Sequence, residues 1–160
     1  MAPTDSRRAV AIVTGGSSQT GGDVARGLAS PAWAIVVVYL EHQSRAEATV
    51  ARIIAAEGTT VAVRADLADD LDVKRLFTES IAAFGGVDVV VHTTTDIAAL
   101  LYRHAARHVR ARGAIVTTST AEPIPQEISR ELRERGITVG RAPPQAVLSF
   151  LGEWRRGTLG

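Results

Sequence analysis

The stretch Val13-Thr14-Gly15-Gly16-Ser17-Ser18-Gln19-Thr20-Gly21-Gly22 decides the fold of this chain. It joins an apolar run that ends at Val13 to the helical pattern that begins at Asp23. Glycines let a backbone approach a pyrophosphate closely, and the free N–H groups of the next helix attract the anion. The order strand, glycine turn, helix therefore predicts a dinucleotide site. Gln19 stands where the usual fingerprint has its middle glycine, and the alternative is a loop that only turns the chain.

Beyond this turn, short apolar runs alternate with longer amphipathic segments, which is typical of βα units that build a parallel sheet covered on both faces. Right-handed crossovers then predict a Rossmann-like, doubly wound α/β fold with strand order 3-2-1-4-5-6. The predicted strands are residues 9–14, 34–39, 60–64, 87–92, 114–118 and 137–140. The predicted helices are residues 21–29, 44–57, 71–84, 96–112, 127–135 and 145–156.

Local signals support several of these boundaries. Ser44 and Glu47 have the spacing of a capping box at a helix start. Gly58, Gly85 and Gly113 follow expected helix ends, where a left-handed backbone is easiest for glycine. These glycines are predicted to be helix C-caps.

The composition is that of a globular protein. The 160 residues suit one domain over residues 1–160, with 46% hydrophobic and 22% charged residues and a net charge of +1. This balance predicts neither a nucleic-acid nor a membrane partner. No cysteine is present, and no apolar run reaches the length of a signal peptide or membrane span, so we expect a cytoplasmic protein.

Several segments, in order, resemble the short-chain dehydrogenase/reductase family. The run from Thr14 to Gly21 looks like the family's T-G-x-x-x-G-x-G, and Asp66-Leu67 looks like its D-V/L element. The run 84–91 is similar to the stretch before the family's N-N-A-G, although His92-Thr93-Thr94-Thr95 follows here. The run 113–120 resembles the strand that carries the catalytic serine, with Thr120 at that position. The run 142–144 is similar to the region of its P-G.

The resemblance implies that the chain binds NAD or NADP. An acidic residue at the end of the second strand would select NAD, but Leu40 takes that position, and Ser44 and Arg45 follow, so NADP is favoured. Glu41 is close enough to reverse this choice. The expected cofactor-binding residues are Thr14, Gly15, Ser17, Ser18, Gln19, Gly21, Tyr39, Ser44, Arg45, Asp66, Leu67 and Thr93.

The family's catalytic set is not found in this chain. The sequence contains no asparagine, its one lysine is Lys74, and neither Tyr39 nor Tyr102 is followed at +4 by lysine. Blocks of the family pattern after Thr95 and after Thr120 have no counterpart, so we expect a shortened member.

Two residues are candidates for the catalytic chemistry that remains. His92 suits acid–base work and Thr120 could polarise a carbonyl or alcohol substrate. The function implied is a dinucleotide-dependent oxidoreductase with a degenerate catalytic set. The alternatives are a silent cofactor-binding relative and an interaction module without ligand.

The segment 96–112 raises two further expectations. His104 and His108 have metal-ligand spacing, but no third ligand is evident and arginines are interleaved, so a solvated basic face without metal is predicted. The apolar residues of the same segment would be free for a partner, including a second copy in a homo-oligomer. They are Ile97, Leu100, Leu101 and Val109.

Overall fold

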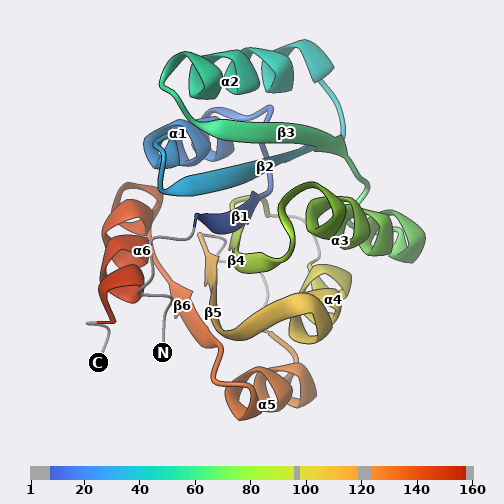
Figure 1. Ribbon diagram of the computed structural model, residues 1–160. Helices are drawn as coiled ribbons and strands as arrows, with labels where there is room; N and C mark the ends of the chain where they lie inside the picture. Colours follow the sequence, from blue (N-terminus) through green and yellow to red (C-terminus); the bar gives the residue numbers. More distant parts are fainter. Residues whose placement is uncertain (1–7, 96–97, 119–123, 158–160) are drawn as a thin grey trace.

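A computed structural model of the chain describes residues 8–95, 98–118 and 124–157 (Figure 1). Its sheet has six strands, paired in parallel in the order β3-β2-β1-β4-β5-β6. The predicted order is therefore confirmed. The strands are β1 Ala9–Val13, β2 Trp33–Tyr39, β3 Thr59–Arg64, β4 Val87–His92, β5 Val109–Thr117 and β6 Thr138–Arg141.

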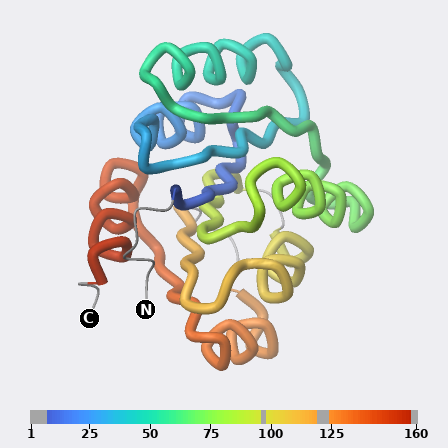
Figure 2. Tube along the Cα trace, viewed as in Figure 1, coloured from blue at the N-terminus to red at the C-terminus, as the bar shows by residue number. Residues whose placement is uncertain are grey.

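Helices cover both faces of this sheet, as the Cα trace in Figure 2 also shows. The helices α1 Gln19–Leu28, α2 Gln43–Ala55 and α6 Val147–Arg156 pack on one face. The helices α3 Asp70–Phe84, α4 Ala99–His108 and α5 Gln126–Glu134 pack on the other. A short 3-10 turn, Pro144–Ala146, precedes α6.

The alternation of side chains along the strands explains why two hydrophobic cores form. Ile12 of β1 points to the α3, α4 and α5 side, whereas Ala11 and Val13 point to the α1, α2 and α6 side. All residues of β1 and β4 are buried. A central parallel strand has no solvent-exposed face, because helices cover both sides of the sheet, so its apolar residues run continuously rather than alternately.

Two tryptophans fasten α6 to the sheet. The ring centroids of Trp33, the first residue of β2, and Trp154 lie 6.3 Å apart. The indole N–H of Trp154 donates a hydrogen bond of 3.2 Å to the carbonyl of Arg112. The guanidinium of Arg155 lies 5.4 Å from the centre of a Trp33 ring. Docking of α6 therefore depends on aromatic contacts at the amino end of β2.

The predicted helix 96–112 is wrong at its carboxyl end. Helix α4 stops at His108, and β5 begins at Val109, which pairs with Val87 of β4. Arg110 then donates to the buried Asp88 carboxylate at 3.0 Å, and the register shifts between Val87 and Val89. This ion pair and the strand pairing outweigh the helical preference of the arginine-rich sequence.

Several predicted caps are also wrong. Helix α2 begins at Gln43, and His42, with a left-handed φ of 60°, takes the cap position without a side-chain hydrogen bond. Ser44 lies inside the helix. Gly85 is left-handed as predicted, but Glu57 and Arg112 adopt the positive φ expected of Gly58 and Gly113. In these last two turns the left-handed residue comes one position before the glycine.

The predicted solvated face of α4 is wrong for His104. This side chain is buried, its Nε2 lies 2.8 Å from Asp70 Oδ1, and its ring stacks on Phe77 and His108. The hydrogen bond from His104 holds the pKa of the Asp70 carboxyl below its usual value. Within the described ranges, no group of three metal-ligating side chains is present.

The predicted free apolar surface of this segment is wrong as well. Leu101 and Val109 are fully buried and Leu100 is partly buried, because α4 packs between α3 and α5. Ile97 lies outside the described residues. Among the helices that the structure describes, none is long and apolar enough to cross a membrane.

Candidate functional site

The glycine turn between β1 and α1 is held by a compact set of hydrogen bonds. Ser18 caps α1: its Oγ accepts from the N–H of Gly21 at 3.2 Å and donates to the carbonyl of Gly15 at 2.7 Å. The N–H of Gly16 donates to the Val38 carbonyl at 2.7 Å and ties the turn to β2. The amino end of α1 is thereby fixed at the carboxyl edge of the sheet.

Gly15 and Gly21 in the turn have no room for a side chain. Gly15 has a φ of 68°, and a Cβ there would lie 2.5 Å from the Thr93 hydroxyl oxygen. A Cβ on Gly21 would lie 2.1 Å from the carbonyl oxygen of Gly15. Close contact between the first helical turn and the loop therefore requires glycine at position 21. Gln19, in contrast, is exposed at the start of α1 and meets no such limit.

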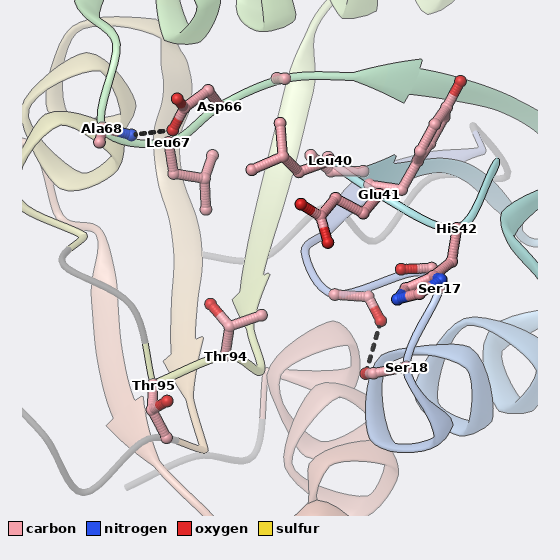
Figure 3. A pocket seen from close by; sticks show the side chains of 14 residues that line it. Ser17, Ser18, Leu40, Glu41, His42, Asp66, Leu67, Ala68, Thr94 and Thr95 are labelled. Carbon is pink, nitrogen blue, oxygen red and sulfur yellow. Dashed lines mark hydrogen bonds between the residues drawn. The ribbon is translucent and has the colours of Figure 1, made fainter.

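A cavity of about 750 Å³ opens beside this turn (Figure 3). Its walls come from the turn and from the carboxyl ends of β2, β3 and β4, where an open α/β sheet binds its ligands. The volume suits an organic ligand of nucleotide size. The described lining residues are Gly15, Ser17, Ser18, Val38, Tyr39, Leu40, Glu41, His42, Ala65, Asp66, Leu67, Ala68, Thr94 and Thr95.

Apolar and acidic groups face each other across this cavity. Leu40 and Leu67 form apolar walls, and the carboxylate of Glu41 points into the space between the end of β2 and Ser18 (Figure 3). Asp66 Oδ1 accepts from the Ala68 N–H at 2.9 Å, which fixes the loop after β3. Among the described lining residues there is no arginine or lysine. Positive potential therefore comes from the amino end of α1.

A buried polar junction supports the turn from below. Thr14 Oγ1 lies 3.0 Å from His92 Nδ1 and accepts from the N–H of Thr93 at 3.0 Å. The Thr93 hydroxyl donates back to the Thr14 carbonyl at 2.8 Å. These hydrogen bonds hold the ends of β1 and β4 together at the residue that precedes Gly15. Thr94 and Thr95, which line the cavity, follow from this fixed point.

The expected cofactor-binding residues separate into two groups. Gly15, Ser17, Ser18, Tyr39, Asp66 and Leu67 line the cavity. The others do not: Thr14 is buried, Thr93 supports the turn, Gln19 and Gly21 lie in α1, and Ser44 and Arg45 are exposed in the first turn of α2.

Eight of the lining residues are not among the expected cofactor-binding residues, although Leu40 and Glu41 entered the expected choice between NAD and NADP. Val38, Leu40, Glu41 and His42 lie around Tyr39 at the end of β2. Ala65 and Ala68 flank Asp66 and Leu67, and Thr94 and Thr95 follow β4. The rule that ligands bind at the carboxyl ends of parallel strands could have found them. What the rule does not supply is the direction of each side chain.

The candidate catalytic residue His92 lies apart from this cavity. His92 is 1% exposed and does not line it, and Thr120 lies outside the described residues. Tyr102 is buried beside His92, and burial raises the pKa of its phenol while a hydrogen bond to Thr117 lowers it. Lys74 is exposed on α3. No tyrosine and lysine therefore meet at the described cavity.

The sheet order, the glycine turn before α1 and the cavity at the strand ends define a Rossmann-like protein with a cavity in the place where such folds bind ligands. A family model described as short chain dehydrogenase matches residues 9–100. The chain belongs to the short-chain dehydrogenase family, a family of oxidoreductases.

Curated relatives match about half of the chain. An uncharacterized oxidoreductase from Methylorubrum extorquens is 36% identical over 85 residues, which cover 53% of this chain and 34% of the relative. A 3-oxoacyl-[acyl-carrier-protein] reductase from Synechocystis is 37% identical over 83 residues, 52% of this chain and 34% of the relative. The matched region spans about a third of the length of these relatives.

A solved structure extends the similarity to the second half. A putative dehydrogenase from Burkholderia cenocepacia, with bound NADP, superposes with a TM-score of 0.75 at 23% identity. The superposition covers 89% of this chain and 71% of that one. At this level of identity the comparison supports the fold of residues beyond the matched half.

Proposed function

We propose that this chain binds a nicotinamide adenine dinucleotide, with the adenosine in the cavity and the pyrophosphate on the glycine turn. The observation that carries the proposal is the turn itself, fixed by Ser18 at the amino end of α1 and open to a cavity of about 750 Å³. Backbone N–H groups and the helix dipole there favour a pyrophosphate. Residues 1–160 then act as a single dinucleotide-binding domain.

The arrangement of the lining residues supports this orientation. The carboxyl group that follows the second strand in such folds binds the ribose of the adenosine, and Glu41 points into the cavity from that place. Leu40 and Leu67 offer apolar surface to a purine ring. Gly15, Ser17 and Ser18 lie on the side where the phosphates would rest.

The proposal includes a choice between the two forms of the cofactor. NADP is supported by Ser44 and Arg45, in the first turn of α2, and by the bound NADP of the Burkholderia protein. NAD is supported by Glu41, because a carboxylate accepts hydrogen bonds from ribose hydroxyls and repels a 2′-phosphate. Separate titrations with the two forms decide between them.

The second candidate function is reduction of a carbonyl group or oxidation of an alcohol with the same cofactor. It is supported by membership of an oxidoreductase family and by the similarity to a 3-oxoacyl-[acyl-carrier-protein] reductase. Hydride transfer also needs a proton donor at the substrate oxygen. His92, the residue expected to supply that proton, is 1% exposed. Thr120, expected to polarise the substrate, lies outside the described residues.

A titration tests the proposal. NADH and NADPH are added separately to the protein, and the emission of the reduced nicotinamide is followed. Saturable binding is expected for at least one form, and it should be lost in Gly21→Val, whose folding is checked by circular dichroism. Absence of binding at millimolar cofactor contradicts the proposal. Turnover of a panel of ketones and alcohols then tests the second candidate.

A further inference from the structure

We infer that His104 and His108 of α4 form an acid-sensitive contact with α3, which opens when both rings take up protons. This contact is separate from the proposed cofactor site, since it lies on the face of the sheet opposite α1 and the glycine turn. The two imidazole rings are nearly parallel, at an interplanar angle of 6° with 6.0 Å between their centroids. Both rings also stack on Phe77, a fully buried residue of α3.

The side chain of His104 has a partner on one side of its ring only. Its Nε2 lies 2.8 Å from Asp70 Oδ1, and because a carboxylate only accepts, this nitrogen carries the hydrogen. The other nitrogen, Nδ1, is buried and has no hydrogen-bond partner among the described residues. Protonation of the ring therefore places an N–H donor there without an acceptor. Asp70 is 64% exposed and also faces Arg103 and Arg107, so its attraction for a charged ring is screened.

His108 is half-buried among positive charges. Lys74 of α3, Arg107 of α4 and Arg135 at the end of α5 all face its ring. Arg135 is fixed there because its guanidinium donates to the carbonyl of Ala106 at 2.5 Å. Burial, a charge on the other histidine and these three cations hold the pKa of His108 below its ordinary value of 6.5. A proton on this ring is therefore unfavourable as long as α3, α4 and α5 stay together.

These contacts fix the direction of the pH effect. Because the pKa of His108 is lower in the folded chain than in the unfolded chain, the folded chain binds fewer protons as the pH falls below 6.5. The stabilising effect of the neutral ring is thus present above this pH and is lost below it. Asp70 stays ionised through the same range, since its pKa is lowered from an ordinary value of 3.8. Acid therefore acts on the histidines, and the last turn of α4 separates from Phe77.

An NMR titration of the histidine rings in the whole chain tests this inference first. The midpoint of His108 should lie below pH 6.5. Lys74→Gln removes one of the facing cations and should raise this midpoint by about 0.2 to 0.7 pH. The matched control is Arg52→Gln, an exposed cation of α2 on the other face of the sheet, which should leave the midpoint unchanged. A midpoint at or above 6.5 overturns the inference.

Thermal unfolding then tests whether the contact opens. His108→Phe keeps a ring on Phe77 that cannot titrate. Between about pH 8 and 5, the thermal midpoint of the unchanged chain should fall about 2–4 °C further than that of this variant. His42→Asn removes an exposed histidine from the cavity and should behave like the unchanged chain. Equal falls with and without His108 would contradict the inference.

Amide hydrogen exchange of the unchanged chain gives a readout that needs no variant. Protection factors in the last turn of α4 should decrease in acid before those of the central strands β1 and β4, because only the contact with α3 opens. If the helix and these strands lose protection together, acid unfolds the whole domain and the inference is wrong. Cofactor binding enters neither measurement, so failure here leaves the proposed function standing.

Discussion

The two halves of the molecule share one parallel sheet but differ in what they contribute to the cavity. Residues 9–95 supply β1 to β4 and all described lining of the cavity, and residues 9–100 match the family model. Residues 98–157 continue the same parallel sheet with β5 and β6, but at the end of β5 Thr117 is 5% exposed, and none of the described residues of this half lines the cavity. The second half therefore completes the sheet in register without adding a described residue to the lining of the cavity.

The largest expected effect comes from the first half. Gly21→Ala places a Cβ 2.1 Å from the Gly15 carbonyl oxygen, so the turn and α1 must separate. We expect a loss of dinucleotide affinity of about 100-fold or more, or about 3 kcal/mol. Calorimetry measures it. The matched control is Gly152→Ala in α6, where the nearest contact is the flexible end of Arg156. Equal binding by both variants would contradict the proposed site.

A pair of hydroxyl deletions compares the two halves directly. Thr14→Val removes the group that joins His92 and Thr93, and should lower the free energy of unfolding by about 1–3 kcal/mol and also weaken cofactor binding. Tyr102→Phe removes the bond to Thr117 and should cost about 1 kcal/mol of stability without changing affinity. Denaturant unfolding and cofactor titration are measured on both. A loss of cofactor affinity in Tyr102→Phe would show that contacts in the second half also affect the cofactor site.

The smallest expected effect concerns the form of the cofactor. Glu41→Gln removes the charge that points into the cavity while keeping the shape of the side chain. NADPH affinity relative to NADH should rise by about threefold to tenfold, because repulsion of the 2′-phosphate ends and a charged acceptor for the ribose is lost. The matched control is Glu47→Gln, which removes a charge from the exposed face of α2 and not from the lining of the cavity. If the ratio of NADPH to NADH affinity did not change, Glu41 would not contact the ribose.

The sequence was most informative where the physical pattern is simple. Apolar runs predicted the six strands, and the rule of right-handed crossovers predicted their order. The end of α4 was missed because Arg110 and Arg112 favour a helix locally, whereas the pairing with β4 and the Asp88 ion pair act over long range. His104 was missed for a related reason: its neighbours are arginines, but it packs on Phe77 of another helix.

The candidate site shows the same division. Gly15, Ser17 and Ser18 could be predicted to line it because the phosphate turn is a local motif. Asp66 and Tyr39 could be predicted from their position at strand ends. Thr94 lines the cavity and Thr93 does not, because the Thr93 hydroxyl donates a hydrogen bond to the Thr14 carbonyl instead. These two residues are 79 positions apart in the sequence, so no local pattern encodes this contact.

The contact between Trp33 and Trp154 also determines what the intrinsic fluorescence of this protein reports. The sequence contains only these two tryptophans, and they lie together at the amino end of β2. Seven residues of strand, about 20 Å, separate Trp33 from the cavity at the other end. Tryptophan emission therefore follows the release of α6 from the sheet. An undocking of α6 that leaves the cofactor in place would appear as a change in tryptophan emission with no change in that of the nicotinamide.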